Sequence, residues 1–491
     1  MAKPKLPSDL YDAARVRALD QAAIRRTGVP AKTLMTQAAA AVLQTLQRRW
    51  PNIKRIIVVC GQGNNAGDGY ALAVLAVRAG YRVQVVQIGR ADRLSEHAQV
   101  WFDSMLAAGI KPESDLEIID AAELIVDALF GIGLSRAVEG SFAAAVAQIN
   151  RSTQPVLSID IPSGINATTG VCMGIAVQAT VTVTFIGLKQ GLFTADGAQY
   201  SGDVVFVDLD ISLDIYGTVQ PTAKLIDMHD VRPLLQPRAR TAHKGDNGHV
   251  LIIGGAPGFS GAILLAGEAA ARTGAGLVSI ATHPEIALGV IANRPELMVH
   301  GVASPADLAS LLARADVVAI GPGLGLSDWA TTMFAAVLRQ KLPLVVDADA
   351  LNLLAIEPSR RDNWVLTPHP GEAARLLAII TQEIHVDRFT AAQKLHEVYG
   401  GTVVLKGAGS IVTDGKISCV LRDGNPGMGS GGMGDTLTGI IAGLIAQGYA
   451  LDDAARIGAC VHARAGDRAA TAGERGLLAS DLMSHIRELV N

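Results

Sequence analysis

The chain has 491 residues, and its 42 Lys and Arg against 46 Asp and Glu give a net charge of −4, which leaves no basic excess for binding nucleic acid or an anionic membrane. Hydrophobic residues make up 49% of the sequence, glycine contributes 52 residues and aromatic residues only 4%, a composition that excludes long disordered regions and is typical of parallel α/β folds. The four cysteines lack CxxC spacing, so we expect neither a zinc site nor disulfides, and the absence of a recognisable secretory signal predicts a cytoplasmic protein.

Strands and helices alternate in the first half of the chain. Helical apolar spacing covers about residues 9–48, and the strand 55–60 (RIIVVC) is followed by a helix over 68–79. Further strands are predicted at 82–88, 124–128, 156–159, 181–185 and 204–207, with helices at 94–108 and 142–150 between them. This order predicts right-handed crossovers and a parallel sheet covered by helices on both faces, a Rossmann-like three-layer sandwich.

The alternation of strands and helices stops at residues 211–244, which contain three prolines and a basic cluster. We therefore expect two domains, residues 1–222 and 223–491. The second domain again alternates, with strands predicted at 249–253, 277–280, 317–320, 344–346, 364–366 and 403–405 and helices at 261–273 and 435–446. The sequence thus predicts two different α/β domains in one chain.

A glycine-rich loop, GQGNNAGDG (61–69), lies between the first strand of the first domain and its helix. Backbone N–H groups at a helix start bind phosphate readily. The partial GxGxxA match is weak, since no acid closes the second strand, and by itself it favours a tight turn. However, Asn64, Asn65 and Asp68 make the loop more polar than a turn requires.

Two further polar loops follow later strands of the same sheet, one beginning at Asp127 (DALFGIGLS) and one at Asp160 (DIPSG). A single Asp at such a position is usually a helix cap. Three polar loops after parallel strands should instead meet in one crevice at the carboxyl edge of the sheet. Their amide, carboxylate and hydroxyl oxygens suit a hard cation.

In order and spacing, the motifs GQGNNAGDG, VDALFGIG and DIPSG resemble the NAD(P)HX epimerase family, and the whole chain resembles its bacterial fusion with an ADP-dependent NAD(P)HX dehydratase. The resemblance implies that K⁺ is held by Asn65, Asp127 and Ser163. It implies a site for the hydrated dinucleotide formed by Asn64, Asn65, Ala66, Gly67, Asp68, Gly131, Ile132, Gly133, Leu134, Ser135, Arg136 and Ala137, with Asp160 at the reacting ring as proton shuttle. One departure is Gln37-Ala38-Ala39, where the family has a more polar sequence; we expect it to affect packing.

In the second domain, the segment NPGMGSGGMGD (425–435) precedes a predicted helix. Glycine-rich backbone at a helix start would bind phosphate oxygens, and Asp435 would lie in the first turn. An isolated Asp there would be an ordinary helix-capping residue, but the density of glycines argues for a nucleotide site. The chain has no GxxxxGK[ST] motif, which disfavours a P-loop NTPase.

This segment resembles the GxGD motif of ribokinase-like kinases, whose aspartate is the base that deprotonates the attacking hydroxyl. The segments KGDNGH, GGAPGFSGA, GPGLG, DADALN, TPHPGE and KGAGS resemble the dehydratase branch more than the sugar kinases. The resemblance implies Asp435 as base, with Ala262, Gly323 and His369 at the substrate and Glu372 positioning Mg²⁺. It implies ADP binding by Lys406, Gly407, Ala408, Gly409, Ser410, Asn425, Pro426, Gly427, Met428, Gly429, Ser430, Gly431, Gly432, Met433 and Gly434. Among other polar residues, His243 and Lys244 lie within reach of a phosphate or are simply solvated.

The implied substrates are NADHX and NADPHX, the hydrated forms of NADH and NADPH, with ADP as co-substrate; we expect a homo-oligomer that binds neither nucleic acid nor membrane. The first domain would interconvert the two epimers, and the second would dehydrate one of them. Two alternatives stay open on sequence grounds. One is a vitamin or sugar kinase fused to a nucleotide-sensing domain; the other is a first domain that only binds dinucleotide or a partner.

Overall fold

The computed structural model describes residues 6–27, 31–291 and 294–491. The chain forms two compact units, Met1–Lys224 and Leu225–Asn491. The strand β10 (Ala223–Ile226) contains the division between them. No described helix is both long and apolar enough to span a bilayer.

The first unit contains a seven-stranded sheet in the order β4-β3-β2-β5-β6-β7-β9, and every neighbouring pair is parallel. Its strands are β2 (Arg55–Cys60), β3 (Arg82–Gln87), β4 (Pro112–Glu113), β5 (Leu124–Ala128), β6 (Val156–Ile159), β7 (Val181–Phe185) and β9 (Asp203–Val207). The helices are α1 (Ala13–Thr27), α2 (Ala31–Arg49), α3 (Asn64–Arg78), α4 (Glu96–Ala107), α5 (Gly140–Arg151), α6 (Gly197–Tyr200) and α7 (Leu213–Tyr216). Within this unit, β1 (Asp9–Tyr11) pairs with the start of β10 and with β8 (Leu188–Lys189).

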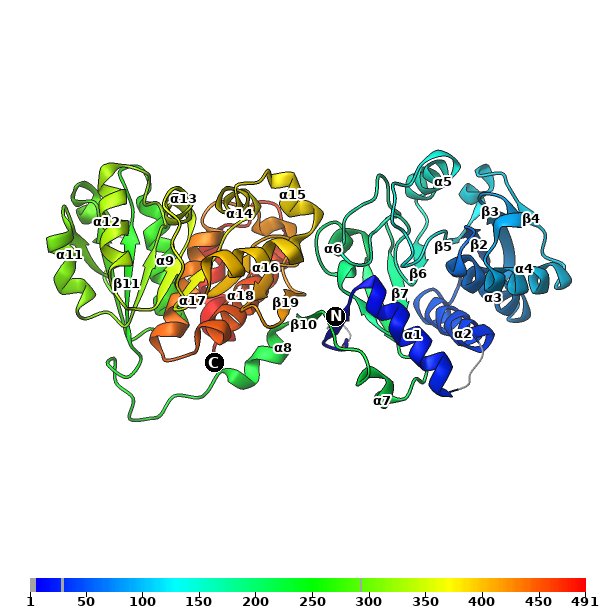
Figure 1. The fold of residues 1–491 in the computed structure, drawn as a ribbon, viewed down its shortest axis with the longest axis horizontal. Coiled ribbons are helices and arrows are strands. Elements are labelled where there is room, and N and C mark those ends of the chain that lie inside the picture. Colours follow the sequence, from blue (N-terminus) through cyan, green and yellow to red (C-terminus); the bar gives the residue numbers. More distant parts are fainter. Residues whose placement is uncertain (1–5, 28–30, 292–293) are drawn as a thin grey trace. The chain divides into compact units, whose positions relative to one another are not determined.

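Alternate residues of the central strand β2 bury their side chains on opposite faces of this sheet, as strand geometry requires. Ile56 and Val58 join the core beneath α1–α4, whereas Ile57 and Val59 join a smaller core beneath α5. Both faces of the sheet are therefore covered (Figure 1). The predicted three-layer α/β sandwich is confirmed.

The second unit has a sheet in the order β13-β12-β11-β14-β15-β16-β17-β18-β19, parallel from β13 to β17 and antiparallel over the last two pairs. Its strands are β11 (His249–Gly254), β12 (Leu277–Thr282), β13 (Met298–Gly301), β14 (Val317–Ile320), β15 (Leu344–Val346), β16 (Trp364–Leu366), β17 (Thr402–Leu405), β18 (Ile411–Thr413) and β19 (Ser418–Leu421). The helices are α8 (Met228–Val231), α9 (Ser260–Thr273), α10 (Ala287–Ile291), α11 (Pro305–Leu312), α12 (Asp328–Leu338), α13 (Ala348–Ile356), α14 (Pro370–Leu377), α15 (Thr381–Val386), α16 (Arg388–Tyr399), α17 (Met433–Ala446), α18 (Leu451–Ala469) and α19 (Leu482–Leu489).

The helix α17 is buried along almost its whole length, which explains why its sequence is apolar on all sides. It packs against α9 and α18, and these helices share one core with the strands at the centre of the sheet. The glycines of α17 permit this close approach: a Cβ on Gly439 would lie 2.1 Å from the carbonyl oxygen of Ala266.

The predicted strands are present, but three predictions of element bounds are wrong. Residues 9–11 form a strand rather than helix, α3 begins at Asn64 instead of residue 68, and α17 begins at Met433 instead of residue 435. The earlier start of α3 places Asn64 and Asn65 in the first helical turn, whereas Asp435 lies in the first turn of α17 as predicted. The sequence analysis also missed the short strands β4, β8, β10, β13, β18 and β19.

Candidate active sites

The three polar loops of the first unit leave the carboxyl ends of β2, β5 and β6, which are neighbours in the parallel sheet. The loop after β2 approaches the loop after β5 so closely that a Cβ on Gly61 would lie 2.1 Å from the carbonyl oxygen of Leu129. Glycine is therefore required at position 61 by packing, whatever the loop binds.

Asn65, Asp127 and Ser163 lie together, and all three side chains are buried. The Ser163 hydroxyl donates to Asp127 Oδ1 at 2.5 Å, and the Ser163 amide donates to Asp127 Oδ2 at 2.8 Å. Asn65 Nδ2 donates to the carbonyl oxygen of Phe130 at 3.0 Å, which leaves its Oδ1 as an acceptor. Burial raises the pKa of Asp127, while hydrogen bonds from Ser163 and Ser158 act in the opposite direction.

This cluster fits a large hard cation, because amide, carboxylate, hydroxyl and carbonyl oxygens meet at one buried point. A cation there would also offset the desolvation that raises the Asp127 pKa. Other members of the predicted dinucleotide site lie around it. Asn64 is exposed and accepts a hydrogen bond from the Ser95 hydroxyl at 2.7 Å, whereas residues 131–137 form a mostly accessible loop whose Gly131 lies against the Asn65 side chain.

Asp160 adopts a left-handed backbone conformation, with φ of +69°, and its amide donates to the carbonyl oxygen of Val183 at 2.7 Å. A residue with a β-carbon adopts such a conformation at a cost, and strain of this kind clusters at functional sites. Its carboxylate forms an ion pair with Lys189, whose side chain is only 1% exposed. Lys189 was not among the residues predicted from the sequence.

Asp20 and Asp68 face the same ion pair. Burial raises the pKa of Asp20 to about 6 and the pKa of Asp68 well above its usual range, and the charge of Asp160 raises both further. Lys189 opposes both shifts. The crevice therefore contains three carboxyl groups and one buried lysine, of which the sequence predicted only Asp68 and Asp160.

In the second unit, the predicted nucleotide loop ends at Gly432, which has φ of +90°, and α17 begins at the next residue. Asp435 lies in the first turn of α17. Burial, followed by the charge of Asp347, raises the pKa of Asp435 to about 7, although Lys406 opposes the shift. A carboxylate with this pKa is well matched to act as a general base near neutral pH.

Asp347 is buried beside this turn and accepts hydrogen bonds from Lys406 Nζ and Thr438 Oγ1, each at 2.8 Å. Burial alone would raise the pKa of Asp347, but the charge of Lys406 and these hydrogen bonds lower it overall. Lys406 also lies 3.8 Å from Glu372 Oε2. Asp347 was recognised only as part of a loop motif, not as a site residue.

His369 caps the start of α14. Its Nδ1 accepts hydrogen bonds from the amides of Gly371 and Glu372, at 3.0 and 3.3 Å, and its own amide donates to Glu372 Oε2 at 2.8 Å. Glu372 Oε1 lies 3.4 Å from His369 Nε2. Both carboxylate oxygens of Glu372 thus face groups of its own capping box and Lys406, and its predicted role in positioning Mg²⁺ stays a prediction.

The loop 406–410 is held by hydrogen bonds from Arg388, a buried residue that the sequence prediction missed. Arg388 Nη2 donates to the carbonyl oxygens of Leu405, Lys406 and Gly409 at 3.3–3.4 Å. Within the loop, the Ser410 hydroxyl donates to Gly407 at 3.0 Å. The backbone amides are therefore held in one arrangement from within the protein.

The second glycine loop, residues 425–434, is anchored at both ends. Asn425 Nδ2 donates to Asp467 at 3.0 Å, and the Ser430 hydroxyl donates to the carbonyl oxygen of Leu477 at 2.9 Å. Elsewhere at the carboxyl edge, Gly323 has φ of +56° and packs against Ala262, since a Cβ there would lie 3.2 Å from the Ala262 side chain. Ala262, Gly323 and Asp435 thus follow strands or begin helices at one edge of the sheet.

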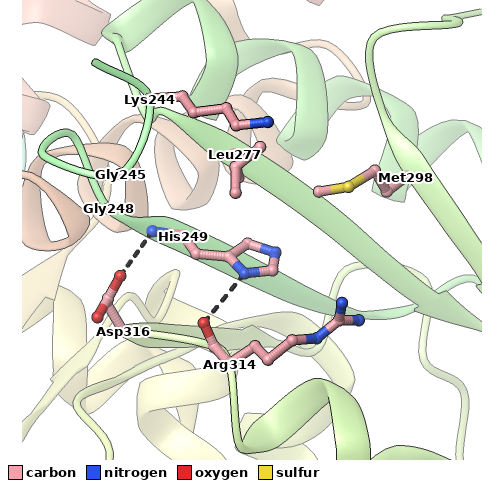
Figure 2. Close-up of a pocket in the computed structure, with 8 residues that line it drawn as sticks. All are labelled: Lys244, Gly245, Gly248, His249, Leu277, Met298, Arg314 and Asp316. Carbon is pink, nitrogen blue, oxygen red and sulfur yellow. Dashed lines mark hydrogen bonds between the residues drawn. The ribbon is translucent and has the colours of Figure 1, made fainter.

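A cavity of about 310 Å³ lies at the opposite edge, where β11, β12 and β13 begin (Figure 2). His249 occupies its floor: its Nδ1 lies 3.0 Å from the carbonyl oxygen of Arg314, and its Nε2 lies 2.8 Å from Ser279 Oγ. Lys244 lines this cavity, at the edge of the sheet opposite the glycine loop of this unit.

The residues match known families over both units. Residues 31–191 match the family model of the YjeF-related protein N-terminus, and residues 250–488 match that of NAD(P)H-hydrate dehydratase. The bifunctional NAD(P)H-hydrate repair enzyme Nnr of Coxiella burnetii is 47% identical over 488 residues, covering 98% of this chain and 99% of that protein. The chain belongs to the bifunctional NAD(P)H-hydrate repair enzymes.

The repair enzyme Nnr of Escherichia coli is 40% identical, covering 99% of this chain and 95% of its own length. A crystal structure of a ribokinase-like superfamily protein from Enterococcus faecalis matches 54% of this chain and 94% of its own, with 29% identity and a TM-score of 0.50. This match confirms the predicted ribokinase-like fold of the second unit. The family models and relatives confirm the prediction of a bifunctional epimerase and dehydratase, and not the alternative of a vitamin or sugar kinase.

Proposed function

We propose that the carboxyl-edge crevice of the first unit interconverts the epimers of NADHX and NADPHX, and that the second unit uses ADP to dehydrate one epimer. The observation that carries this proposal is Asp435, a carboxyl group with its pKa raised to about 7 at the end of a glycine-rich loop and the start of a helix. Such a group is poised to accept a proton from a hydroxyl while the loop amides bind phosphate.

In the dehydratase reaction, Asp435 accepts the proton of the C6 hydroxyl of the hydrated ring as that oxygen attacks the terminal phosphorus of ADP. The P–O bond to AMP breaks, and AMP leaves. The phosphorylated carbinol then loses phosphate as the electron pair of the ring nitrogen forms a C=N⁺ bond, and loss of a ring proton restores the dihydronicotinamide. Phosphate leaves far more readily than hydroxide, which explains the need for a nucleotide.

Residues 406–410 and 425–434 would hold the nucleotide through backbone amides, with Lys406 adding positive charge near its phosphates. His369, Gly323 and Ala262 would border the hydrated ring. Mg²⁺ would be bound chiefly through the nucleotide's own phosphate oxygens, as is usual for this ion, and would neutralise phosphate charge. Glu372 then serves to hold His369 in place.

In the epimerase crevice, residues 64–68 and 131–137 would bind the dinucleotide, and Asp160 would act as the proton shuttle for the oxygen bound to C6. K⁺ fits the oxygen cluster of Asn65, Asp127 and Ser163, where it would supply a fixed positive charge that orders these oxygens. The carbon that changes configuration is a hemiaminal, so reversible cleavage of its C–O bond or opening of the ring is sufficient for epimerisation.

The test is a repair assay on NADHX of mixed epimers with ADP and Mg²⁺, following the return of dihydronicotinamide absorbance. Recovery of all the cofactor, beyond the fraction that starts as the usable epimer and after subtraction of spontaneous epimerisation, supports both activities. Recovery that stops at that fraction removes the epimerase assignment. The variant Asp435→Asn should show no ADP-dependent recovery, whereas recovery at the wild-type rate would remove Asp435 as the base.

A further inference from the structure

The ammonium group of Lys189 reaches the epimerase crevice from β8, which lies outside the central sheet of the first unit. β8 pairs in parallel with β1, so that Lys189 stands beside Tyr11, and α1 follows directly after β1. Gly187 lies against the side chains of Leu19 and Val16, which fixes β8 against α1. The same packing therefore brings Lys189 and the α1 residue Asp20 to one place.

Every polar contact of the Lys189 ammonium is to a fixed acceptor. It donates to the Asp160 carboxylate, to Thr184 Oγ1 at 3.0 Å and to the carbonyl oxygen of Phe185 at 3.0 Å. Thr184 in turn donates to Asp160 at 3.4 Å. Three donations from one buried ammonium leave it no freedom to bind substrate, but they hold the Asp160 carboxylate in place.

Asp68 differs from Asp160 in its contacts. Among the residues that the structure describes, the carboxyl group of Asp68 has no ion pair and no hydrogen bond, and burial raises its pKa well above the usual range. The charged groups that face this pair are Asp20 and Arg17 from α1, Lys189 from β8, and the two carboxyl groups themselves. Of these carboxyl groups, all in the described part of the chain, that of Asp160 alone receives a hydrogen bond from Lys189.

We propose that Lys189 is a positioning residue of the epimerase centre, which holds the Asp160 carboxylate in place as the proton acceptor while Asp68, left without this contact, is the proton donor. The inference rests on the proposed epimerase function of the crevice and assigns its two proton-transfer roles. Two carboxyl groups in different protonation states at one pH are what a reaction needs when a proton must be given and another taken.

The step balances by the C–O cleavage route. Asp68 gives its proton to the C6 hydroxyl, the C6–O bond breaks as the ring nitrogen's electron pair forms C=N⁺, and water leaves. A water molecule adds to C6 from the other face and gives a proton to Asp160. One proton has then passed from Asp68 to Asp160, and exchange with solvent returns it before the next turnover.

The experiment uses the full chain and NADHX of mixed epimers with ADP and Mg²⁺. The fast phase reports the dehydratase, and the slow phase, corrected for spontaneous epimerisation, reports the epimerase. Lys189→Met should lower the rate of the slow phase by about 10-fold or more, since the Asp160 carboxylate loses the buried donor that holds it in place. Lys189→Arg should restore most of the rate.

The matched control is Lys224→Met, which removes an exposed lysine 3.6 Å from Asp9 in the same unit and should leave both phases unchanged. If Lys189 acts through Asp160, then Asp160→Asn and Asp160→Asn/Lys189→Met should have equal slow phases. Comparing these two variants also tests the positioning role if Lys189→Met alone fails to fold. The double variant lacks both charges of the buried ion pair, so neither is left unpaired. Asp68→Asn should also lower the rate of the slow phase, because the proton donor is lost.

If the wild-type protein shows no slow phase above the spontaneous rate, the proposed epimerase function itself is wrong. With an active wild type, the positioning role is overturned if Lys189→Met keeps the wild-type rate, if Lys189→Arg is as slow as Lys189→Met, or if the lysine substitution slows the Asp160→Asn variant further. A donor role for Asp68 is overturned if Asp68→Asn retains the wild-type rate.

Discussion

Lys406 and Asp347 form a buried ion pair directly beneath the first turn of α17, with 2.8 Å between Nζ and Oδ1. A Cβ on Gly434 would lie 3.2 Å from this ammonium and 3.5 Å from Asp347 Oδ2. Glycine at position 434 therefore allows the first turn of α17 to pack closely against the Lys406–Asp347 ion pair. The same pair tunes Asp435, because Asp347 raises its pKa and Lys406 lowers it.

Replacing Lys406 by Met should destabilise the second unit, because Asp347 is 1% exposed and would be left as an unpaired buried charge. Loss of one partner of a buried pair costs about 3–5 kcal/mol. Urea unfolding monitored for the second unit measures this, with Lys341→Met, at an exposed lysine, as control. The double variant Asp347→Leu/Lys406→Met should recover part of the loss; an unchanged midpoint for Lys406→Met would contradict the argument.

Dehydratase activity should depend on pH through Asp435. Its carboxyl group has a pKa of about 7, so the ionised base is lost as pH falls below 7, and the rate on the usable epimer should fall tenfold per pH unit on the acidic side. Asp435→Asn should reduce the rate by about 10²–10⁴-fold and abolish this limb, while epimerase activity persists. A pH–rate profile of the fast phase is the measurement, and an unchanged acidic limb in Asp435→Asn would show that another group titrates.

The raised pKa of Asp435 also predicts that this residue lowers the free energy of unfolding at neutral and alkaline pH. Its folded-state pKa of about 7 exceeds the usual value of 3.8, so the unfolded chain ionises first and folding is penalised from about pH 4 upward, fully so above pH 7. Asp435→Asn should therefore be more stable than the wild type at pH 8, by at most a few kcal/mol, and equal to it near pH 4. Denaturant midpoints at the two pH values test the sign, which would be reversed if Asp435 were stabilised in its ionised form.

K⁺ should stabilise the first unit if it binds the oxygen cluster, since a ligand that binds only the folded state raises the melting temperature. In the wild type, KCl should raise the melting temperature of this unit by several degrees over choline chloride at equal ionic strength. Ser163→Ala removes a hydroxyl that donates to Asp127 and should abolish the difference, whereas Ser104→Ala, distant from the cluster in the chain and bonded to Val100, should keep it. An equal K⁺ effect in wild type and Ser163→Ala would exclude this cluster as the site.

The sequence predicted the parallel strands and the polar loops because both are local patterns: aliphatic runs of strand length, and glycine with Asn and Asp after them. It did not predict Lys189 or Asp20, since a lysine after a short apolar segment and an aspartate within a helix carry no local signal. Only the pairing of β1 with β8 brings them to Asp160. Asp347 was visible in the DADALN motif, but its burial beside Lys406 joins residues 59 positions apart.

Arg388 is another residue whose role depends on contacts between distant parts of the sequence. Its replacement should weaken ADP binding more than it slows the chemical step. Arg388 is 2% exposed and donates to the carbonyl oxygens of Leu405, the last residue of β17, and of Lys406 and Gly409 in the loop that follows, and burial lowers its pKa to about 10. Arg388→Met leaves those acceptors without their donor, so the loop amides lose their fixed arrangement. We expect the KM for ADP to rise about 10-fold or more with a smaller change in kcat, whereas Arg339→Met, at an exposed position of the same unit, should change neither. A fall in kcat at an unchanged KM for ADP would show that the loop acts on the chemical step rather than on nucleotide binding.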